Sequence, residues 1–225
     1  QGFIYCWYRN GFDADIKQQL GHALHDGLLK ARYLDRFRFV IMWENGCGTG
    51  CRGSDDLLNN LMPYWIENYF KNPSYARLDG RPLLYIWVPN NLTRDLGGSE
   101  NVRNALNQMR EACRRAGLNG LYIVGCVGTA DKVTLPRMAT EGWDASSAYG
   151  LIGPTDDEPG EDVEGIPTID HRSSLANQEK IWLGKKEIGA LPDIIDVMMG
   201  WDPRPWHGPR TARYLAGASP AHFEA

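Results

Sequence analysis

Two carboxylate residues stand directly after tryptophans at the ends of apolar runs. Glu44 follows Trp43, and Asp202 follows Trp201. Glycoside hydrolysis generally needs two carboxyl groups that face each other across the bond, one as acid and one as base or nucleophile. We therefore predict that Glu44 and Asp202 are the catalytic pair, provided that both segments line one cleft. The alternative for each acid is that it binds sugar hydroxyls or pairs with a nearby arginine.

Aromatic and amide side chains lie at or near the ends of several apolar runs. Sugars stack their C–H faces on aromatic rings, while their hydroxyls need charged and amide partners. Pro203 and Pro205 stiffen the backbone around Arg204, because proline fixes its own φ angle. The predicted substrate-binding residues are Trp7, Tyr8, Trp43, Asn45, Trp87, Tyr149, Trp201, Arg204, Trp206 and His207. Trp65 and Trp182 lie inside helical patterns and are predicted to be packing residues.

The composition fits a folded domain rather than a nucleic-acid-binding one. The chain has 225 residues, 43% of them hydrophobic, and a net charge of −4. This negative net charge gives no sign of the excess of lysine and arginine that nucleic-acid-binding proteins need, and it argues against a nucleic-acid partner. No apolar run approaches the roughly 20 residues that span a bilayer. The chain starts at Gln1 without a signal peptide, so we expect a processed product or a fragment, in an extracytoplasmic (periplasmic or secreted) setting.

The apolar runs predict alternating strands and helices. Strands are expected at 2–8, 37–43, 82–88, 121–126, 144–149 and 193–200, and helices at 13–34, 55–70, 100–116, 131–141 and 173–188. Ser54 is the expected N-cap of the second helix, with Asp55 and Asp56 placed well against its dipole. Gly117 is the expected C-cap of the third helix. The acidic stretch 153–165 is interpreted as a loop inserted in one unit.

This alternation, with continuous apolar strands, is typical of a parallel sheet covered by helices. We predict an α/β fold: a (β/α)8 TIM-barrel-like domain over residues 1–225, incomplete at both ends, with about six strands recognised. An open doubly wound sheet is the alternative. The barrel is favoured because nearly every strand's carboxyl end carries functional groups, as barrel active sites require. In an open sheet these groups should concentrate near one switch point.

The segment Gly48–Gly53 matches G-x-G-x-x-G after a strand and before a helix. This context would favour a dinucleotide. However, Asp55 and Asp56 would repel a pyrophosphate, and the next strand ends without an acid to hold a ribose. We therefore interpret the glycines as a flexible loop over a cleft and predict no cofactor. Cys47 and Cys51 are close enough for a disulfide. No second Cys or His pair has structural zinc spacing, so no metal site is predicted.

Two sequence blocks resemble the family-99-like glycoside hydrolases, a group that includes endo-α-mannosidases and WbsX-type proteins of polysaccharide gene clusters. They are residues 64–75, YWIENYFKNPSY, and residues 79–87, DGRPLLYIW. Trp43-Glu44-Asn45 and Gly200-Trp201-Asp202 fit the same pattern, and the similarity runs from about residue 2 to residue 206. The resemblance implies a β/α barrel that acts on α-linked or otherwise complex glycans, α-mannosidic ones among them.

The sequence departs from that family in two places. Family members usually continue after Gly-Trp-Asp with Asn-Thr-Pro-Arg, whereas this chain has Pro203-Arg204-Pro205-Trp206. The family's catalytic glutamates lie in a later Glu-Trp-containing block, which nothing after Asp202 matches. The expected partner is an oligosaccharide or polysaccharide substrate, hydrolysed by the protein. The alternatives are a non-catalytic carbohydrate-binding protein on the same scaffold, and a glycosyltransferase-like protein of polysaccharide biosynthesis that needs a nucleotide-sugar donor.

Overall fold

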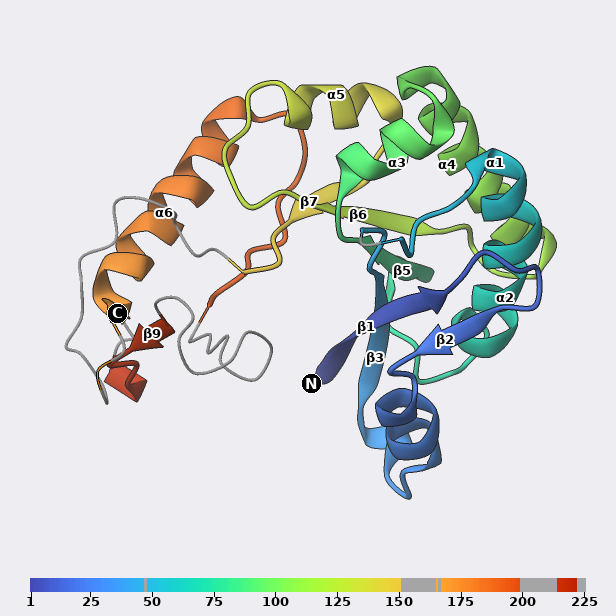
Figure 1. Ribbon diagram of the computed structural model, residues 1–225, viewed down its shortest axis with the longest axis horizontal. Coiled ribbons are helices and arrows are strands. Elements are labelled where there is room, and N and C mark those ends of the chain that lie inside the picture. The colour runs from blue at the N-terminus through green and yellow to red at the C-terminus, as the bar shows by residue number, and fades with distance from the viewer. Residues whose placement is uncertain (47, 151–164, 166, 199–213, 222–225) are drawn as a thin grey trace. The chain divides into compact units, whose positions relative to one another are not determined.

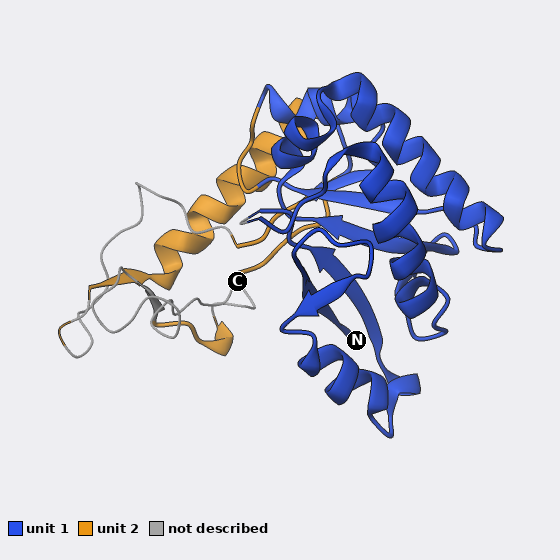
Figure 2. Ribbon diagram, turned by 45° about the vertical axis from the view of Figure 1, so that its right-hand side comes forward, with its two compact units in different colours: residues 1–127, 132–146, 190–192 blue, residues 128–131, 147–189, 193–225 orange. Residues whose placement is uncertain are grey.

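The computed structural model describes residues 1–46, 48–150, 165, 167–198 and 214–221 (Figure 1). The chain divides into two compact units (Figure 2). Unit 1 comprises residues 1–127, 132–146 and 190–192, and unit 2 comprises residues 128–131, 147–189 and 193–225. The single domain over 1–225 stays a prediction.

A largely parallel sheet forms the centre of unit 1. Its strands are β1 Gly2–Asn10, β2 Lys17–Gln19, β3 Arg38–Trp43, β4 Arg77–Leu78, β5 Arg81–Ile86, β6 Tyr122–Cys126 and β7 Ala145–Ser147. Their order is β2-β1-β3-β5-β6-β7, with β4 beside β5. The pairs β1–β3, β3–β5 and β5–β6 are parallel, while β2 and β4 are antiparallel to β1 and β5.

The winding of this sheet decides between the two predicted architectures. Within the described residues, each parallel strand lies beside the one that precedes it in the chain, so the order does not reverse there. A doubly wound sheet would reverse its order at a switch point. The fold is therefore of the singly wound β/α type that builds barrels, and the alternative is wrong. Over the described residues the sheet does not close, so the barrel is incomplete.

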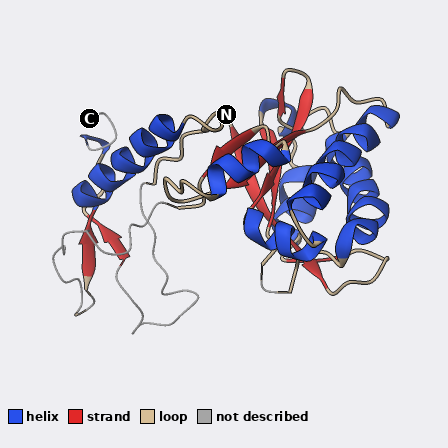
Figure 3. Ribbon diagram, turned by 90° about the horizontal axis from the view of Figure 1, so that it is seen from above, coloured by secondary structure: helices blue, strands red, loops and turns tan. Residues whose placement is uncertain are grey.

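The helices of unit 1 follow the strands along one side of the sheet (Figures 1 and 3). After β3, a continuous helix comprises α1 Gly53–Asp56, a π-type stretch Leu57–Leu61, α2 Met62–Trp65 and a second π-type stretch Ile66–Phe70. It is followed by α3 Pro89–Leu96, α4 Ser99–Arg115 and α5 Thr134–Glu141. The predicted helices at 55–70, 100–116 and 131–141 are thus confirmed, as are the strands at 2–8, 37–43, 82–88, 121–126 and 144–149.

The predicted ends of two helices have different outcomes. Gly117 adopts the left-handed conformation directly after α4, with φ of 84°, as expected of a glycine that ends a helix. Ser54 is not an N-cap, because the helix already begins at Gly53. The N-cap position belongs to Arg52, whose backbone N–H donates to the Asp56 carboxylate at 2.9 Å. Asp56 thus satisfies the N–H of the N-cap residue itself, and no side chain caps the first turn of the helix.

The predicted helix at 13–34 is wrong. The segment contains β2 and then short helical pieces: a π-type turn at Ala23–Gly27 and 3-10 turns at Leu28–Lys30 and Leu34–Arg36. Leu20 takes a left-handed backbone conformation (φ 53°), which a helix interior does not allow. By contrast, α3 was not expected, because Pro89 followed by two asparagines resembles a turn. Proline is nevertheless well tolerated at the first helical position, and Gly97 ends the helix with φ of 80°.

Unit 2 contains a long helix and a two-stranded parallel sheet. β8 Thr168–Asp170 pairs with β9 Tyr214–Ala216, and α6 runs from His171 to Ile188. The side chain of Asp170 caps this helix by accepting a hydrogen bond from the Arg172 backbone N–H at 2.7 Å. The predicted helix at 173–188 is confirmed. It begins two residues earlier than expected, because Asp170 supplies the cap.

The predicted strand at 193–200 is wrong over its described part. Residues 194–198 belong to no strand, although Asp193 forms a β-bridge and the Ser147 hydroxyl donates to the Ile194 carbonyl at 2.9 Å. Side chains of α6 also hold the segment. The Gln178 amide accepts from the Met198 N–H at 2.9 Å and donates to the Met198 carbonyl at 3.3 Å. Lys185 contacts the Asp193 carboxylate at 2.9 Å. A segment with the apolar composition of a strand is therefore held by two polar side chains on one face of α6, those of Gln178 and Lys185.

Asp196, in this segment, is expected to make the stability of unit 2 depend on pH. Burial raises the pKa of its carboxyl above the ordinary value, although the Gly150 backbone hydrogen bond and the Lys185 charge act the other way. Its buried Oδ2 finds no hydrogen-bond partner among the described residues. The stabilisation is fully present below the unfolded pKa and is lost as pH rises through the folded one.

An Asp196→Asn variant should therefore flatten the pH dependence of unfolding above about pH 4. Hydrogen exchange of the α6 amides, measured from pH 4 to 7, reports the stability of unit 2 directly. Asp193→Asn is the comparison variant: it removes a charge that contributes to the raised pKa and leaves the Asp196 carboxyl in place, so it should flatten the pH profile less than Asp196→Asn does. A pH profile of Asp196→Asn that coincides with the wild-type profile would contradict the assignment.

Candidate functional site

Strand register sorts the side chains at the carboxyl ends of β1, β3 and β5 onto two faces. Cys6 pairs with Met42, and Met42 pairs with Tyr85, so these three share one face of the sheet. Trp7 and Trp43 pair with each other on the opposite face. Because side chains alternate along a strand, the residue after each tryptophan returns to the first face. Tyr8 and Glu44 are these residues.

Trp7 and Trp43 lie in the core beneath the helix that follows β3. Both are fully buried, and their rings lie 5.3 and 5.2 Å from the ring of Trp65. The Trp7 indole N–H donates to the Tyr69 hydroxyl at 3.1 Å, and that of Trp43 donates to the Thr49 carbonyl at 2.9 Å. In this structure neither ring offers a surface to a sugar. Trp65 is the packing residue that the sequence predicts.

Glu44 and Trp87 meet at the carboxyl ends of β3 and β5. Glu44 is 5% exposed, and its Oε1 accepts a hydrogen bond from the Gly46 N–H at 3.1 Å. A side chain at Gly46 would place its Cβ 2.6 Å from Glu44 Oε1 and 2.7 Å from Trp87 Cζ3. The carboxylate and the half-buried indole ring therefore flank the same glycine. Only glycine permits this close approach.

The Asn45 side chain joins these two strand ends. Its amide nitrogen donates to the Val88 carbonyl at 2.9 Å, and its amide oxygen accepts from the Val88 N–H at 2.8 Å. The Asn91 side chain, at the start of α3, donates to the Asn45 carbonyl at 3.1 Å. The residue is 1% exposed. The amide that the sequence assigned to substrate is thus bonded to the protein itself.

The loop Gly48–Gly53 is packed by side chains rather than open for a phosphate. A Cβ at Gly50 would lie 2.4 Å from the Asp95 carboxylate, so acidic oxygen occupies the space beside this glycine. Cys51 is a buried free thiol. Burial raises its pKa to about 12, helped by the charges of Asp95 and Asp56, so the thiolate is not formed at neutral pH. Cys47 lies outside the described residues.

A buried ion pair that the sequence analysis missed lies next to this loop. Arg9 directly follows Tyr8, and its guanidinium contacts both oxygens of Asp56, at 2.6 and 2.9 Å. The Asp56 carboxylate also accepts from the Asn60 side chain at 2.8 Å. Burial acts to raise the pKa of Asp56, but its hydrogen bonds with Arg9, Asn60 and the Arg52 backbone together lower it. A lone arginine at the end of an apolar strand was the available signal.

Two further carboxylates near strand ends, those of Asp144 and Asp170, have structural roles. Asp144 lies at the amino ends of the strands, where its backbone N–H donates to the Ile123 carbonyl at 3.0 Å. Its carboxylate contacts Arg81 at 3.0 Å and Arg110 at 2.7 Å. It is therefore at the opposite end of the sheet from Glu44. Asp170 caps α6 within unit 2.

The remaining predicted residues fall into two groups. Tyr8 is half-buried on β1, and Tyr149, in unit 2, is 48% exposed. The predicted residues Trp201, Asp202, Arg204, Trp206 and His207 lie outside the described residues. Their convergence with Glu44 stays a prediction. Within the described part of the chain, no group of three or more His, Cys, Asp or Glu residues is placed to hold a metal ion.

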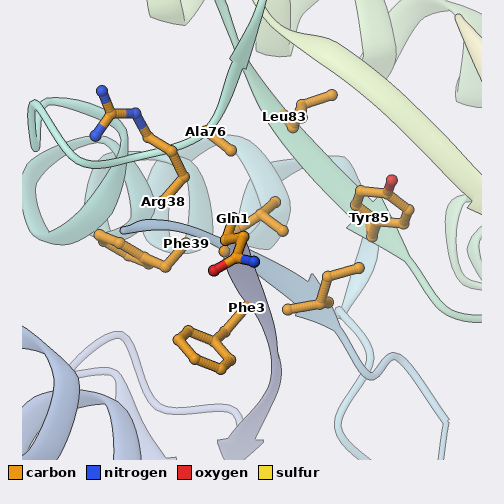
Figure 4. A pocket seen from close by; sticks show the side chains of 10 residues that line it. Gln1, Phe3, Arg38, Phe39, Ala76, Leu83 and Tyr85 are labelled. Atoms are coloured by element: carbon orange, nitrogen blue, oxygen red, sulfur yellow. The ribbon is translucent and has the colours of Figure 1, made fainter. Parts of the chain in front are cut away.

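A separate cavity of about 360 Å³ lies at the amino ends of β1, β3 and β5 (Figure 4). Its walls are mostly apolar, with Ile4, Val40 and Tyr85 from the same sheet face as Cys6 and Met42. Glu44 and Trp87 follow the carboxyl ends of these strands and do not line it. The cavity is therefore distinct from the candidate site.

No helix in the described ranges is long and apolar enough to cross a membrane.

No protein-family model matches this chain, and no curated protein sequence matches it. Among solved structures, it is similar to the GH99 endo-α-mannosidase from Bacteroides thetaiotaomicron, with 16% identity and a TM-score of 0.49 over 92% of this chain and 52% of that chain. A structure of that enzyme with bis-tris propane gives 18% identity and a TM-score of 0.43, over 76% and 46%. The chain thus spans about half the length of these structures. Both belong to the glycoside hydrolase family that the sequence blocks resemble.

Proposed function

We propose that this chain carries part of the active site of a glycoside hydrolase that acts on complex glycans, including α-mannosidic ones. The observation that carries the proposal is the placement of Glu44 beside the Trp87 ring at the carboxyl ends of neighbouring parallel strands. Active sites of β/α barrels are built at this edge. The resemblance of the blocks at 64–75 and 79–87 to family-99-like hydrolases supports the same function.

The two side chains offer complementary contacts to a sugar. The Trp87 ring provides an apolar surface for a C–H face, and Glu44 provides carboxylate oxygens for hydroxyl groups or for proton transfer. Both oxygens of Glu44 already accept one hydrogen bond, and a carboxylate has further lone pairs to offer. We assign Glu44 as one of the two carboxyl groups and Asp202 as the other.

Incubation with α-mannan-type oligosaccharides, followed by product analysis, tests the proposal. Glu44→Gln keeps the shape of the side chain and removes its acid–base function, so it should lower the rate of hydrolysis at least about 100-fold. Glu67→Gln is the matched control, because that side chain is 63% exposed and forms a surface ion pair with Lys71. Equal activity of wild type and Glu44→Gln, or no cleavage by the wild type, counts against hydrolysis at this site.

A non-catalytic carbohydrate-binding protein is the second candidate. The observation that favours it is the confinement of Glu44, which is 5% exposed and held through both oxygens by its own loop. A carboxylate fixed in this way is suited to accept hydrogen bonds from hydroxyl groups of a bound sugar. This function predicts that the oligosaccharides change the tryptophan fluorescence without product formation. Trp87→Ala should then abolish the fluorescence change.

A further inference from the structure

Thr49 folds the loop after β3 back onto the end of that strand. It is 5% exposed, and its backbone N–H donates to the Gly46 carbonyl at 2.7 Å. Its own carbonyl accepts the indole N–H of Trp43, which the core holds in place. The backbone of Thr49 is thus tied to a fully buried residue, and its hydroxyl is brought to the carboxylate of Glu44.

The Thr49 hydroxyl has one hydrogen and three acceptors within reach. These are the Glu44 carbonyl, Glu44 Oε2 and the Gly46 carbonyl, the last at 2.9 Å. Only Oε2 belongs to a carboxyl group, and hydrogen bonds to a carboxylate are roughly twice as strong as those to a neutral carbonyl. The hydroxyl therefore donates to the carboxylate. Threonine also has restricted χ1 freedom, so little rotamer freedom is lost when its hydroxyl is aimed there.

The two oxygens of Glu44 are held by neutral donors from one short loop. The Gly46 N–H donates to Oε1, and Thr49 donates to Oε2. The glycines around Thr49 permit this arrangement: Gly48 takes a φ of 80°, and Gly50 has no room for a side chain beside Asp95. The motif that resembles a phosphate-binding loop thus has a structural role of its own, since its second residue, Thr49, donates to a carboxylate.

We propose that Thr49 is a positioning residue, whose hydroxyl fixes the orientation of the Glu44 carboxylate beside the Trp87 ring. This inference rests on the proposed function of Glu44, and it adds the group that holds the acid ready for a sugar. Thr49 itself makes no contact with the glycan. Its effect is transmitted through Glu44 alone.

Two substitutions at one position test this role in hydrolysis. Thr49→Val keeps the shape and removes the hydroxyl, whereas Thr49→Ser keeps the hydroxyl. With α-mannan-type oligosaccharides, Thr49→Val should lower kcat by about 10- to 100-fold, the range for one hydrogen bond to a charged group, with little change in KM. Thr49→Ser should restore most of the rate. Equal losses in both variants, or a loss in KM alone, would overturn the proposal.

Hydrogen exchange at the Gly46 amide tests the same role without any substrate. This amide donates to the other oxygen of Glu44, so its protection depends on how firmly the carboxylate is held. Exchange should be at least about 10-fold faster in Thr49→Val than in the wild type and Thr49→Ser. If the wild type neither cleaves nor binds the oligosaccharides, the proposed function fails, and exchange at Gly46 still decides the role of Thr49. Unchanged exchange in Thr49→Val overturns it.

Discussion

Replacing Arg9 with methionine is expected to lower the free energy of unfolding by about 3–5 kcal/mol, the usual cost of leaving one partner of a buried ion pair alone. The side chain of Arg9 is fully buried and that of Asp56 is 9% exposed, so neither charge is well solvated. Without the guanidinium, Asp56 keeps only its hydrogen bonds from Asn60 and the Arg52 backbone. Urea unfolding followed by tryptophan fluorescence measures the loss.

The double substitution Arg9→Met with Asp56→Leu should recover most of that stability, because it removes both buried charges. Lys30→Met is the surface control. It breaks an exposed pair with Asp26 and should change the free energy of unfolding by no more than about 1 kcal/mol. A loss in Arg9→Met no larger than in this control would show that the pair does not hold unit 1 together.

The same pair predicts how stability falls in acid. The pKa of Asp56 is lowered in the folded state, so its contribution is present above the unfolded pKa and is lost as pH falls through the folded one. Arg9→Met removes the main hydrogen-bond partner that lowers this pKa. Its unfolding free energy should therefore decline less steeply than that of the wild type between pH 5 and about pH 3.

Trp65→Ala is expected to cost about 3–5 kcal/mol, as is usual when a buried aromatic side chain is truncated. Trp65 is fully buried, and its ring contacts the rings of both Trp7 and Trp43. Truncation therefore opens a cavity beneath two further tryptophans. It also removes support from Trp43, which anchors the carbonyl of Thr49. Urea unfolding, with near-ultraviolet circular dichroism of the remaining tryptophans, measures both effects.

Trp65→Phe separates the loss of volume from the loss of the indole N–H. That N–H finds no hydrogen-bond partner among the described residues, so phenylalanine breaks no bond there. It should cost less than half as much as alanine. Tyr33→Ala, at a 50% exposed ring, is the surface control. If Trp65→Ala and Tyr33→Ala are equally mild, the tryptophan cluster does not form the core of unit 1.

The sequence predicts the sheet of unit 1 well, because its strands are continuous apolar runs. The same continuity conceals which face each residue occupies. Phe39–Trp43 is apolar at every position, so no alternation indicates that Trp43 turns toward the helix and Glu44 away from it. Sequence reasoning therefore assigned both Trp7 and Trp43 to the sugar, whereas the register of β1 against β3 places both in the core.

The failures elsewhere have other physical causes. Residues 13–34 carry apolar residues at helical spacing, but a left-handed Leu20 interrupts the pattern. The segment at 193–198 has the composition of a strand, yet the polar side chains of Gln178 and Lys185 on α6 hold it. These partners are distant in sequence, and periodicity detects only neighbours along the chain. Glu44 was found because a carboxylate after an apolar run is conspicuous without any knowledge of its partners.

Asn45 gives the candidate site a rigidity that is present before any glycan arrives. Its amide exchanges two hydrogen bonds with Val88, as a residue in a neighbouring strand would, at the point where the ladder between β3 and β5 ends. The two strand ends that carry Glu44 and Trp87 are therefore held rigidly to each other. A sugar bound there, as the proposed function requires, loses its own freedom but need not order the protein, so less of its contact energy is spent on ordering these strand ends.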